Sequence, residues 1–313
     1  MRVVILDDYQ NVSRTFADWS TLGAEVEVVT RPIVDTADLV SVLSGAEAVV
    51  AMRERTVFDA DRLGRLPDLR LLVTTGAANA SIDLEAARAH GVTVCGTEAP
   101  RTATPELTWG LILAVLRHIP AEDVRLRAGG WQETIGADLA GSRLGVIGLG
   151  RLGSRVARIG QAFGMDVVAW SANLTPERAA EVGVRAVGKE ELLETSDVVT
   201  IHYKLSDRSR GLIGANELAL MRQSAILINT SRAGLVDTAV LTDALESGAI
   251  RGAGLDVYDT EPLPADHPLR TSPRTVLTPH LGYVTEGTYR IFYPQAVEDI
   301  AAWIAGEPIR VLT

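Results

Sequence analysis

A strand-like run, a glycine-rich turn and a helical pattern follow one another in the middle of the chain. Arg143–Ile147 is followed at once by Gly148-Leu-Gly-Arg-Leu-Gly153 and then by apolar residues at helical spacing. In such a unit the three glycines allow a tight turn, close approach of a pyrophosphate and close packing of helix on strand. The glycines could also serve packing alone. The sequence favours a dinucleotide site at the helix N-terminus, with Gly148, Gly150, Arg151, Leu152 and Gly153 as predicted ligands.

Strand-like and helical stretches alternate along the whole chain. Val3–Leu6 and Ala48–Ala51 are examples in the first third, and Val198–Ile201 is one in the second half. This alternation is typical of parallel sheets covered by helices. Since 313 residues exceed one ordinary core, we predict an α/β protein with two doubly wound parallel-sheet domains.

Two helical stretches are predicted to carry the chain between these domains. Thr104–Arg117 leads into the second domain, and Thr285–Ile304 leads back to the first. The first domain is then discontinuous, with residues 1–100 and 285–313, and residues 101–284 form the dinucleotide-binding domain.

Composition excludes several other classes of function. Thirty basic and forty acidic side chains give a net charge of −10, which repels polyanions and argues against a nucleic-acid partner. Cys95 is the only cysteine, so no intrachain disulfide or cysteine-based metal site is expected. We predict no metal site of any kind. The most apolar helix, Leu107–Leu116, is shorter than the about 20 residues of a membrane span, and the N-terminus lacks a signal-peptide pattern. We therefore expect a cytoplasmic protein without a membrane partner.

Three polar segments follow buried strand-like runs in the second half. They supply Arg232, Glu261 and His280. The carboxyl ends of parallel strands are where open α/β sheets bind ligands. An arginine that binds a carboxylate, a histidine that donates a proton and a glutamate that keeps the histidine charged suit reversible reduction of a keto acid. The other histidines at helix ends or before proline, His90, His118 and His267, are predicted to be structural.

With these motifs the chain resembles the D-isomer-specific 2-hydroxyacid dehydrogenase family, which includes phosphoglycerate dehydrogenases and glyoxylate or hydroxypyruvate reductases. The resemblance rests on the glycine turn, Asn229–Asp237, the Glu261-Pro262 pair and the Pro279-His280 pair, in this order. It implies a Rossmann NAD(P)-binding domain and a flavodoxin-like substrate domain. It also implies hydride transfer between NAD(P)H and a small 2-oxo acid or D-2-hydroxy acid, with His280 as proton donor and acceptor.

The resemblance further implies a set of cofactor contacts. His202 is expected to line the cofactor pocket, Asp256 to hold the nicotinamide carboxamide, and Thr230 and Ser231 to lie along the nicotinamide riboside. Ser171 departs from the pattern, because an acidic residue at this position would grip the ribose 2′-hydroxyl. Without that carboxylate a 2′-phosphate is not repelled, yet the nearest cations are Arg178 and Lys204. We expect NADP to be accepted, and NAD is not excluded.

In relatives, backbone N–H groups of a glycine-rich turn bind the substrate carboxylate. Here Thr74–Asn79 occupies that place, so we predict substrate contacts from Gly76 and Ala77, in addition to Arg232. Arg53 is predicted to join them as a second cation for a substrate with another acidic or polar group. Arg53 and Arg55 could equally be solvated. The segment Ala121–Ala140 resembles the arm through which relatives form dimers, which predicts a homodimer through the cofactor domain.

Two alternatives stay open at this point. Some relatives bind the dinucleotide and act as transcriptional corepressors, so a regulatory protein of the same fold is one alternative. A dehydrogenase for another small acid, such as formate, phosphite or 3-phosphoglycerate, is the other. The presence of Arg232, Glu261 and His280 together favours an enzyme.

Overall fold

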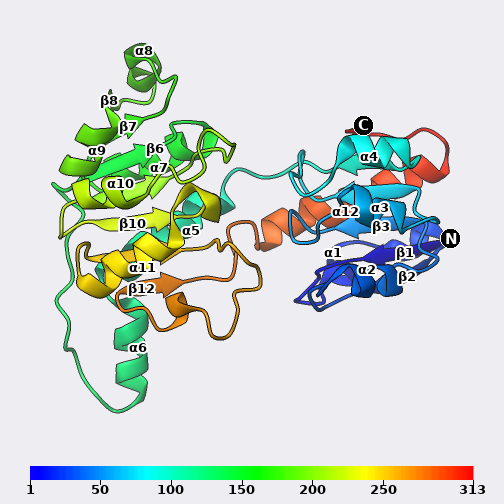
Figure 1. Cartoon of the computed structure of the whole chain (residues 1–313), viewed down its shortest axis with the longest axis horizontal. Coiled ribbons are helices and arrows are strands. Elements are labelled where there is room, and N and C mark those ends of the chain that lie inside the picture. Colours follow the sequence, from blue (N-terminus) through cyan, green and yellow to red (C-terminus); the bar gives the residue numbers. More distant parts are fainter. Residues whose placement is uncertain (313) are drawn as a thin grey trace. The chain divides into compact units, whose positions relative to one another are not determined.

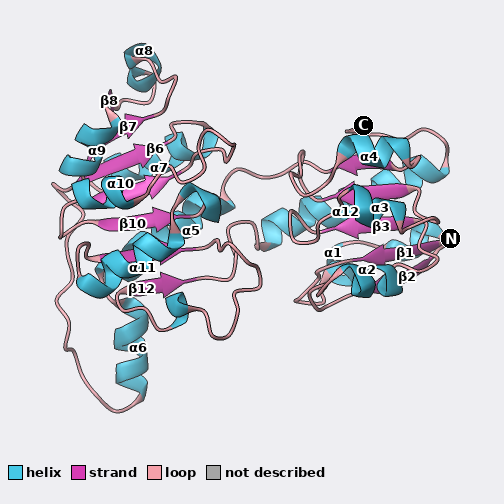
Figure 2. Ribbon diagram, viewed as in Figure 1, coloured by secondary structure: helices cyan, strands magenta, loops and turns pink. Residues whose placement is uncertain are grey.

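The computed structural model describes residues 1–312, and these residues form two compact units (Figure 1). One unit is Met1–Pro100 with the described part of Thr285–Thr313, and the other is Arg101–Val284. Each contains one sheet whose neighbouring strands are parallel, with helices packed against it (Figure 2). The predicted fold class is therefore confirmed.

The first unit has a sheet of five strands in the order β2-β1-β3-β4-β5. This is the flavodoxin-like order, with β1 next to both β2 and β3. The strands are β1 (Arg2–Ile5), β2 (Glu25–Val28), β3 (Ala48–Ala51), β4 (Leu71–Thr74) and β5 (Thr93–Gly96). The helices are α1 (Ser13–Phe16), η1 (Trp19–Leu22), α2 (Thr36–Val42), α3 (Ala60–Gly64), α4 (Leu84–Ala89) and α12 (Glu286–Ile304).

The second unit has a sheet of seven strands in the order β12-β11-β10-β9-β6-β7-β8. Read from β8, this is the Rossmann order with one further strand, and the order reverses between β6 and β9. The strands are β6 (Arg143–Ile147), β7 (Asp166–Trp170), β8 (Arg185–Ala186), β9 (Val198–Ile201), β10 (Ile226–Asn229), β11 (Gly252–Leu255) and β12 (Thr275–Leu277). The helices are α5 (Ala103–Leu116), α6 (Ile119–Arg127), α7 (Arg151–Ala162), α8 (Pro176–Ala180), α9 (Lys189–Thr195), α10 (Ala215–Leu220), η2 (Ala233–Leu235), α11 (Thr238–Ser247) and η3 (Pro268–Arg270).

Local sequence explains these elements. The strands β3, β4, β9 and β10 are buried along their whole length, as continuous apolar runs in parallel sheets should be. Asp35, Asp59 and Asp83 each accept a backbone N–H bond at the start of α2, α3 and α4. Such a cap typically stabilises a helix by about 1 kcal/mol.

The structure differs from the sequence expectations in a few places. The strand expected over Ala253–Val257 ends at Leu255, so Asp256 and Val257 lie in the loop after it. The short strand β8 was not predicted, because two residues carry no periodic signal. The helix α6 was not predicted either, since it buries none of its residues. In residues 1–312 no helix combines the length and the apolar character needed to cross a membrane.

Candidate active site

The glycine turn after β6 requires glycine at two of its three positions. Gly148 has φ +98°, and a Cβ there would lie 2.4 Å from the carbonyl oxygen of His202. A Cβ on Gly153 would lie 2.0 Å from the carbonyl oxygen of Gly148. At Gly150 a Cβ would meet no atom within 4 Å. The turn is therefore tight on its inner side and open at its middle glycine.

The helix α7 begins at this opening with unsatisfied donors. Gly150 is its N-cap and has no side chain to accept a bond, and the first turn contains no acidic residue. The N–H groups of the first turn lack intrahelical partners, and this end of the helix dipole is positive. The turn thus fits an anionic pyrophosphate, which is the group that such a helix start binds.

The end of β7 lies beside the glycine turn. The Oγ of Ser171 accepts the backbone N–H of Leu149 at 3.0 Å. The Trp170 ring stacks on Tyr203 with 5.8 Å between centroids, and the Tyr203 hydroxyl accepts the N–H of Ala172 at 3.4 Å. The two cations noted in the sequence, Arg178 and Lys204, are exposed. Within residues 1–312 neither forms a side-chain ion pair.

His202 connects β9 to the same turn. Its backbone N–H donates to Ile147 at 2.7 Å, and its Nε2 lies 3.0 Å from the Oγ1 of Thr200. Burial lowers the pKa of His202 to about 4. The imidazole is therefore neutral at physiological pH, which suits a lining role better than proton donation.

His280 and Glu261 meet although they belong to different loops. Glu261 follows β11 and His280 follows β12, and the His280 Nδ1 lies 2.6 Å from the Glu261 Oε2. Their side chains are 17% and 22% exposed. The other oxygen of Glu261, Oε1, accepts the N–H of Tyr258 at 3.0 Å. Among the described residues Nε2 of His280 has no hydrogen-bond partner, so this nitrogen is free to exchange a proton with a ligand.

The loop that carries His280 is held by Asp256. His280 has φ +54°, a conformation that costs a non-glycine residue on the order of 1–3 kcal/mol. The buried carboxylate of Asp256 accepts the hydroxyl of Thr278 at 2.6 Å, the N–H of Leu281 at 2.7 Å and the N–H of Gly282 at 2.8 Å. Burial raises the pKa of Asp256 against these donors. Both oxygens thus support the loop, a function that the sequence did not reveal.

Arg232 follows β10 in a loop with many internal bonds. Its Nη1 donates to the carbonyl of Ser231 at 2.7 Å, and its own carbonyl accepts the amide of Asn229 at 3.0 Å. The Ser231 hydroxyl donates to the carbonyl of Tyr203 at 2.7 Å, and Thr230 shares a hydroxyl hydrogen bond of 2.8 Å with Thr108. Arg232, Glu261 and His280 therefore follow three neighbouring strands of one sheet.

The predicted substrate residues Arg53, Gly76 and Ala77 lie in the other unit. They follow β3 and β4, which are neighbours in its sheet. The Nη1 of Arg53 donates to the carbonyl of Thr75 at 2.8 Å, and its guanidinium covers Gly76 where a Cβ would be. The Gly76 N–H donates to the Oγ1 of Thr97 at 2.8 Å, so it is already satisfied inside the protein. Ala77 is exposed.

Sequence reasoning missed a polar cluster at the same edge. The buried Asp7 follows β1 with φ +58° and accepts the hydroxyls of Thr56 at 2.7 Å and Tyr9 at 3.0 Å. Burial raises the pKa of Asp7. The guanidinium carbon of Arg55 lies 4.7 Å from the centre of the Tyr9 ring. An acidic residue directly after an apolar strand was the only available signal.

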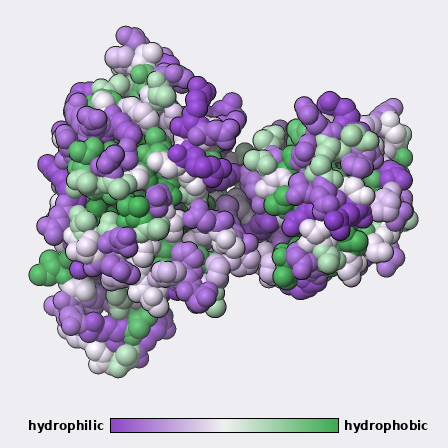
Figure 3. Space-filling model, viewed as in Figure 1, coloured by the Kyte–Doolittle hydropathy of each residue, from purple (hydrophilic) through white to green (hydrophobic). Residues whose placement is uncertain are grey.

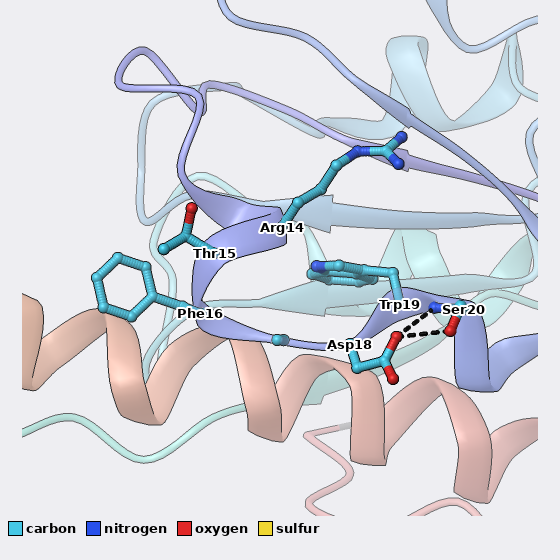
Figure 4. A pocket seen from close by; sticks show the side chains of 7 residues that line it. Arg14, Thr15, Phe16, Asp18, Trp19 and Ser20 are labelled. Carbon is cyan, nitrogen blue, oxygen red and sulfur yellow. Dashed lines mark hydrogen bonds between the residues drawn. The ribbon is translucent and has the colours of Figure 1, made fainter.

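One hollow and the cysteine lie apart from the predicted site residues. A hollow of about 450 Å³ in the first unit is lined by residues 14–20, with the Asp18 carboxylate bonded to Ser20, and it contains no predicted site residue (Figure 4). Cys95 is buried, and burial raises the pKa of its thiol to about 11. Within residues 1–312 no cluster of three or more His, Cys, Asp or Glu side chains could hold a metal ion.

Comparison with known proteins adds independent information. A model of the D-isomer specific 2-hydroxyacid dehydrogenase, NAD binding domain, matches residues 109–282. The chain is 39% identical to a glyoxylate reductase of Aeropyrum pernix over 80% of its length and 77% of the relative. It is 33% identical to a D-3-phosphoglycerate dehydrogenase of Bacillus subtilis over 91% of its length, but it spans only 54% of that protein. The structure of a phosphoglycerate oxidoreductase from Vibrio cholerae superimposes with a TM-score of 0.93, at 36% identity over 98% of this chain and 99% of that one.

Proposed function

The chain belongs to the D-isomer specific 2-hydroxyacid dehydrogenase family of NAD(P)-linked oxidoreductases, and we propose that it interconverts a small 2-oxo acid and the D-2-hydroxy acid. One observation carries this proposal. The Nδ1 of His280 lies 2.6 Å from the Glu261 carboxylate, while its Nε2 has no partner within the described residues. A histidine oriented in this way can deliver a proton to a ligand from one nitrogen.

A nicotinamide cofactor held by the glycine turn would supply the hydride that adds to the carbonyl carbon in the proposed reaction. Arg232 binds the substrate carboxylate through its planar guanidinium and polarises the carbonyl. His280 donates the proton from Nε2 to the carbonyl oxygen, and Glu261 stabilises the imidazolium through Nδ1. In the reverse direction neutral His280 accepts the hydroxyl proton. The glycine turn, Ser171, His202, Thr230, Ser231 and Asp256 are the proposed surroundings of the cofactor.

Acceptance of NADP is part of the proposal. Ser171 offers a hydroxyl where an acidic residue would repel a 2′-phosphate, and Arg178 and Lys204 are exposed cations without an ion pair in residues 1–312. Ser171→Asp should weaken NADPH binding at least about tenfold relative to NADH, because a carboxylate would face the phosphate. Titration of the protein's tryptophan fluorescence with each cofactor gives the two dissociation constants and their ratio. A wild-type preference for NAD of more than about 100-fold would exclude this part of the proposal.

The substrate class is proposed to be small 2-oxo acids such as glyoxylate, pyruvate or hydroxypyruvate. Arg232, Glu261 and His280 need only a carboxylate and an adjacent carbonyl. A dehydrogenase for 3-phosphoglycerate or formate, or a regulatory dinucleotide-binding protein, remains an alternative that the same assay tests. The similarity to proteins named D-3-phosphoglycerate dehydrogenase supports testing 3-phosphoglycerate as a substrate.

The deciding experiment follows the absorbance of NADPH and NADH separately while a panel of 2-oxo acids, with 3-phosphohydroxypyruvate, is offered. His280→Ala is the control. Oxidation by the wild type and not by the variant supports the reductase and identifies cofactor and acid together. Cofactor binding without turnover of any acid would favour the regulatory alternative. Equal rates in the wild type and in His280→Ala would show that His280 does not transfer the proton.

We also propose a homodimer through the second unit. The helix α6 buries none of its residues, and Trp131 and Ile135 in the following loop are 74% and 88% exposed. Apolar surface is visible around α6 in the space-filling view (Figure 3). A hollow of about 500 Å³ between α5 and α6 includes Leu113 and Leu126. Such a patch is unusual on a monomer. Light scattering should give twice the monomer mass, and Trp131→Asp should give monomers.

A cytoplasmic location is likewise a proposal, which fractionation would test.

A further inference from the structure

Tyr258 lies in the loop after β11, three residues before Glu261, and its side chain reaches the loop that carries His280. Its backbone N–H donates to the Glu261 Oε1 at 3.0 Å. Its hydroxyl lies 2.9 Å from the carbonyl oxygen of Thr278 and 3.1 Å from that of Leu255. One residue therefore binds the glutamate through its main chain and the histidine loop through its side chain.

The contacts of Tyr258 bear on the distance between Glu261 and His280, which the strands alone do not determine. Glu261 lies in the loop after β11, and His280 lies in the loop after β12. The carboxylate of Asp256 accepts hydrogen bonds from the N–H groups of Leu281 and Gly282, on the C-terminal side of His280. The Tyr258 hydroxyl holds the carbonyl of Thr278, on the N-terminal side. The histidine loop is thus bound on both sides by residues of the β11 loop.

The phenol is suited to this position. Burial raises the pKa of Tyr258 above its usual range, so the hydroxyl stays protonated and keeps donating. Its hydroxyl bonds the carbonyl oxygens of Leu255 and Thr278, and a proton shared between these two carbonyls links the ends of β11 and β12. Phenylalanine would keep the ring and the backbone N–H, and it would remove only this clamp.

We propose that Tyr258 is a positioning residue for proton transfer, whose hydroxyl keeps His280 within short hydrogen-bond distance of Glu261. The proposal rests on the proposed function. It assigns Tyr258 no contact with substrate or cofactor. The expected consequence is a change in turnover without a change in binding.

Steady-state kinetics provide the first test. Tyr258→Phe should lower kcat of the reduction roughly tenfold, because the partly buried hydrogen bond from its hydroxyl to Thr278 is lost from the support of His280. The KM of the acid and the Kd of the cofactor should stay within twofold. Tyr289→Phe is the matched control, since its hydroxyl bonds Gln10 at 3.1 Å in the other unit. An unchanged kcat in Tyr258→Phe, or a loss confined to KM, would overturn the proposal.

The second test does not depend on activity. A proton in a hydrogen bond of 2.6 Å resonates far downfield in an NMR spectrum, and Glu261→Ala should remove the signal and so assign it to the Nδ1 of His280. In Tyr258→Phe the signal should move upfield or disappear, and in Tyr289→Phe it should stay. An unmoved signal in Tyr258→Phe contradicts the proposal even if no substrate has been found.

A double variant separates positioning from general loosening. If Tyr258 acts through the Glu261–His280 contact, Tyr258→Phe should cost less than twofold once Glu261→Ala has removed that contact. A full tenfold loss in both backgrounds would show an independent structural effect and overturn the proposal. Failure of the proposed function has a different result, because then either the wild type turns over no acid or His280→Ala reacts as fast as the wild type.

Discussion

The carboxyl edges of the two sheets have the same architecture and different chemistry. In the first unit, Asp7 and Arg53 follow β1 and β3 with positive φ, and in the second unit His280 follows β12 in the same way. At the first edge the polar groups largely satisfy one another, as Asp7 does with Thr56. At the second edge a carboxylate binds one nitrogen of His280 and leaves the other accessible. Doubly wound sheets thus supply positions, and the side chains after each strand decide the chemistry, which we propose to be substrate recognition at the first edge and proton transfer at the second.

The sharpest way to break this comparison is to remove the proton donor. His280→Ala should lower kcat about 10²–10⁴-fold, the usual contribution of a positioned acid-base group. Tyr9→Phe at the first edge should change kcat less than threefold, since it removes hydroxyl contacts with Asp7 and Arg55 that lie away from His280 in the chain's other unit. The rate of NADPH oxidation measures both. Similar losses at the two edges would contradict a division between recognition and proton transfer.

Arg232 offers the next largest effect. Arg232→Lys should raise the KM of the acid and lower kcat together, with roughly 10–100-fold lost in kcat/KM, because an ammonium cannot match a planar bidentate contact. Initial rates over a range of acid concentrations provide the two constants. Arg222→Lys, at a surface ion pair with Asp197 in the same unit, is the control and should leave both unchanged. If the two variants had the same kinetic constants, the assignment of Arg232 to the substrate site would be wrong.

Arg53 can sharpen what the first edge recognises. Arg53→Ala should cost about tenfold in kcat/KM for an acid with a second anionic group, since one charge-assisted bond is lost. For glyoxylate the cost should be under threefold. The ratio of the two acids, measured in one assay, cancels any general damage to the fold. An equal cost for both acids would mean that Arg53 only supports its own turn through the Thr75 carbonyl.

His202 gives the smallest effect, and it concerns stability. The pKa of His202 is lowered to about 4 in the folded protein. Between about pH 6.5 and pH 4 its imidazole is therefore protonated in the unfolded chain and neutral in the folded one. This contribution to the free energy of unfolding is fully present above pH 6.5 and is lost as the pH falls. Between pH 7 and pH 5 the loss should be roughly 1–2 kcal/mol. Urea unfolding at both values should show a smaller loss in His202→Gln, with His90→Gln as an exposed control. Equal losses in all three proteins would exclude this explanation.

Much of the candidate site could be predicted because its chemistry is local in the sequence. The glycine turn needs a strand before it and a helix after it, and all three are contiguous from Arg143 to Ala162. Arg232, Glu261 and His280 each follow an aliphatic run, so their position at strand ends could be expected. The helix α6 and the strand β8 escaped prediction because neither buries an apolar face of recognisable period.

Contacts between distant loops could not be predicted in the same way. The Gly76 N–H was expected to be available for a substrate, yet the hydroxyl of Thr97, directly after β5, accepts it. Asp256 was expected to face the cofactor, and its oxygens bond the loop of His280. A donor or acceptor in the sequence has no visible partner until the strand order brings another loop beside it.

The sequence by itself determined the α/β class, the dinucleotide turn and the three residue types of the proposed reaction, because periodicity and motif spacing are properties of neighbouring residues. Only the tertiary structure decided that Glu261 and His280 touch and that Arg53 covers Gly76. It also decided that Tyr258 and Asp256 bind the loop that carries His280. These contacts depend on which strands are neighbours in each sheet. The free energy of burying both sheets selects that order, and no single segment encodes it.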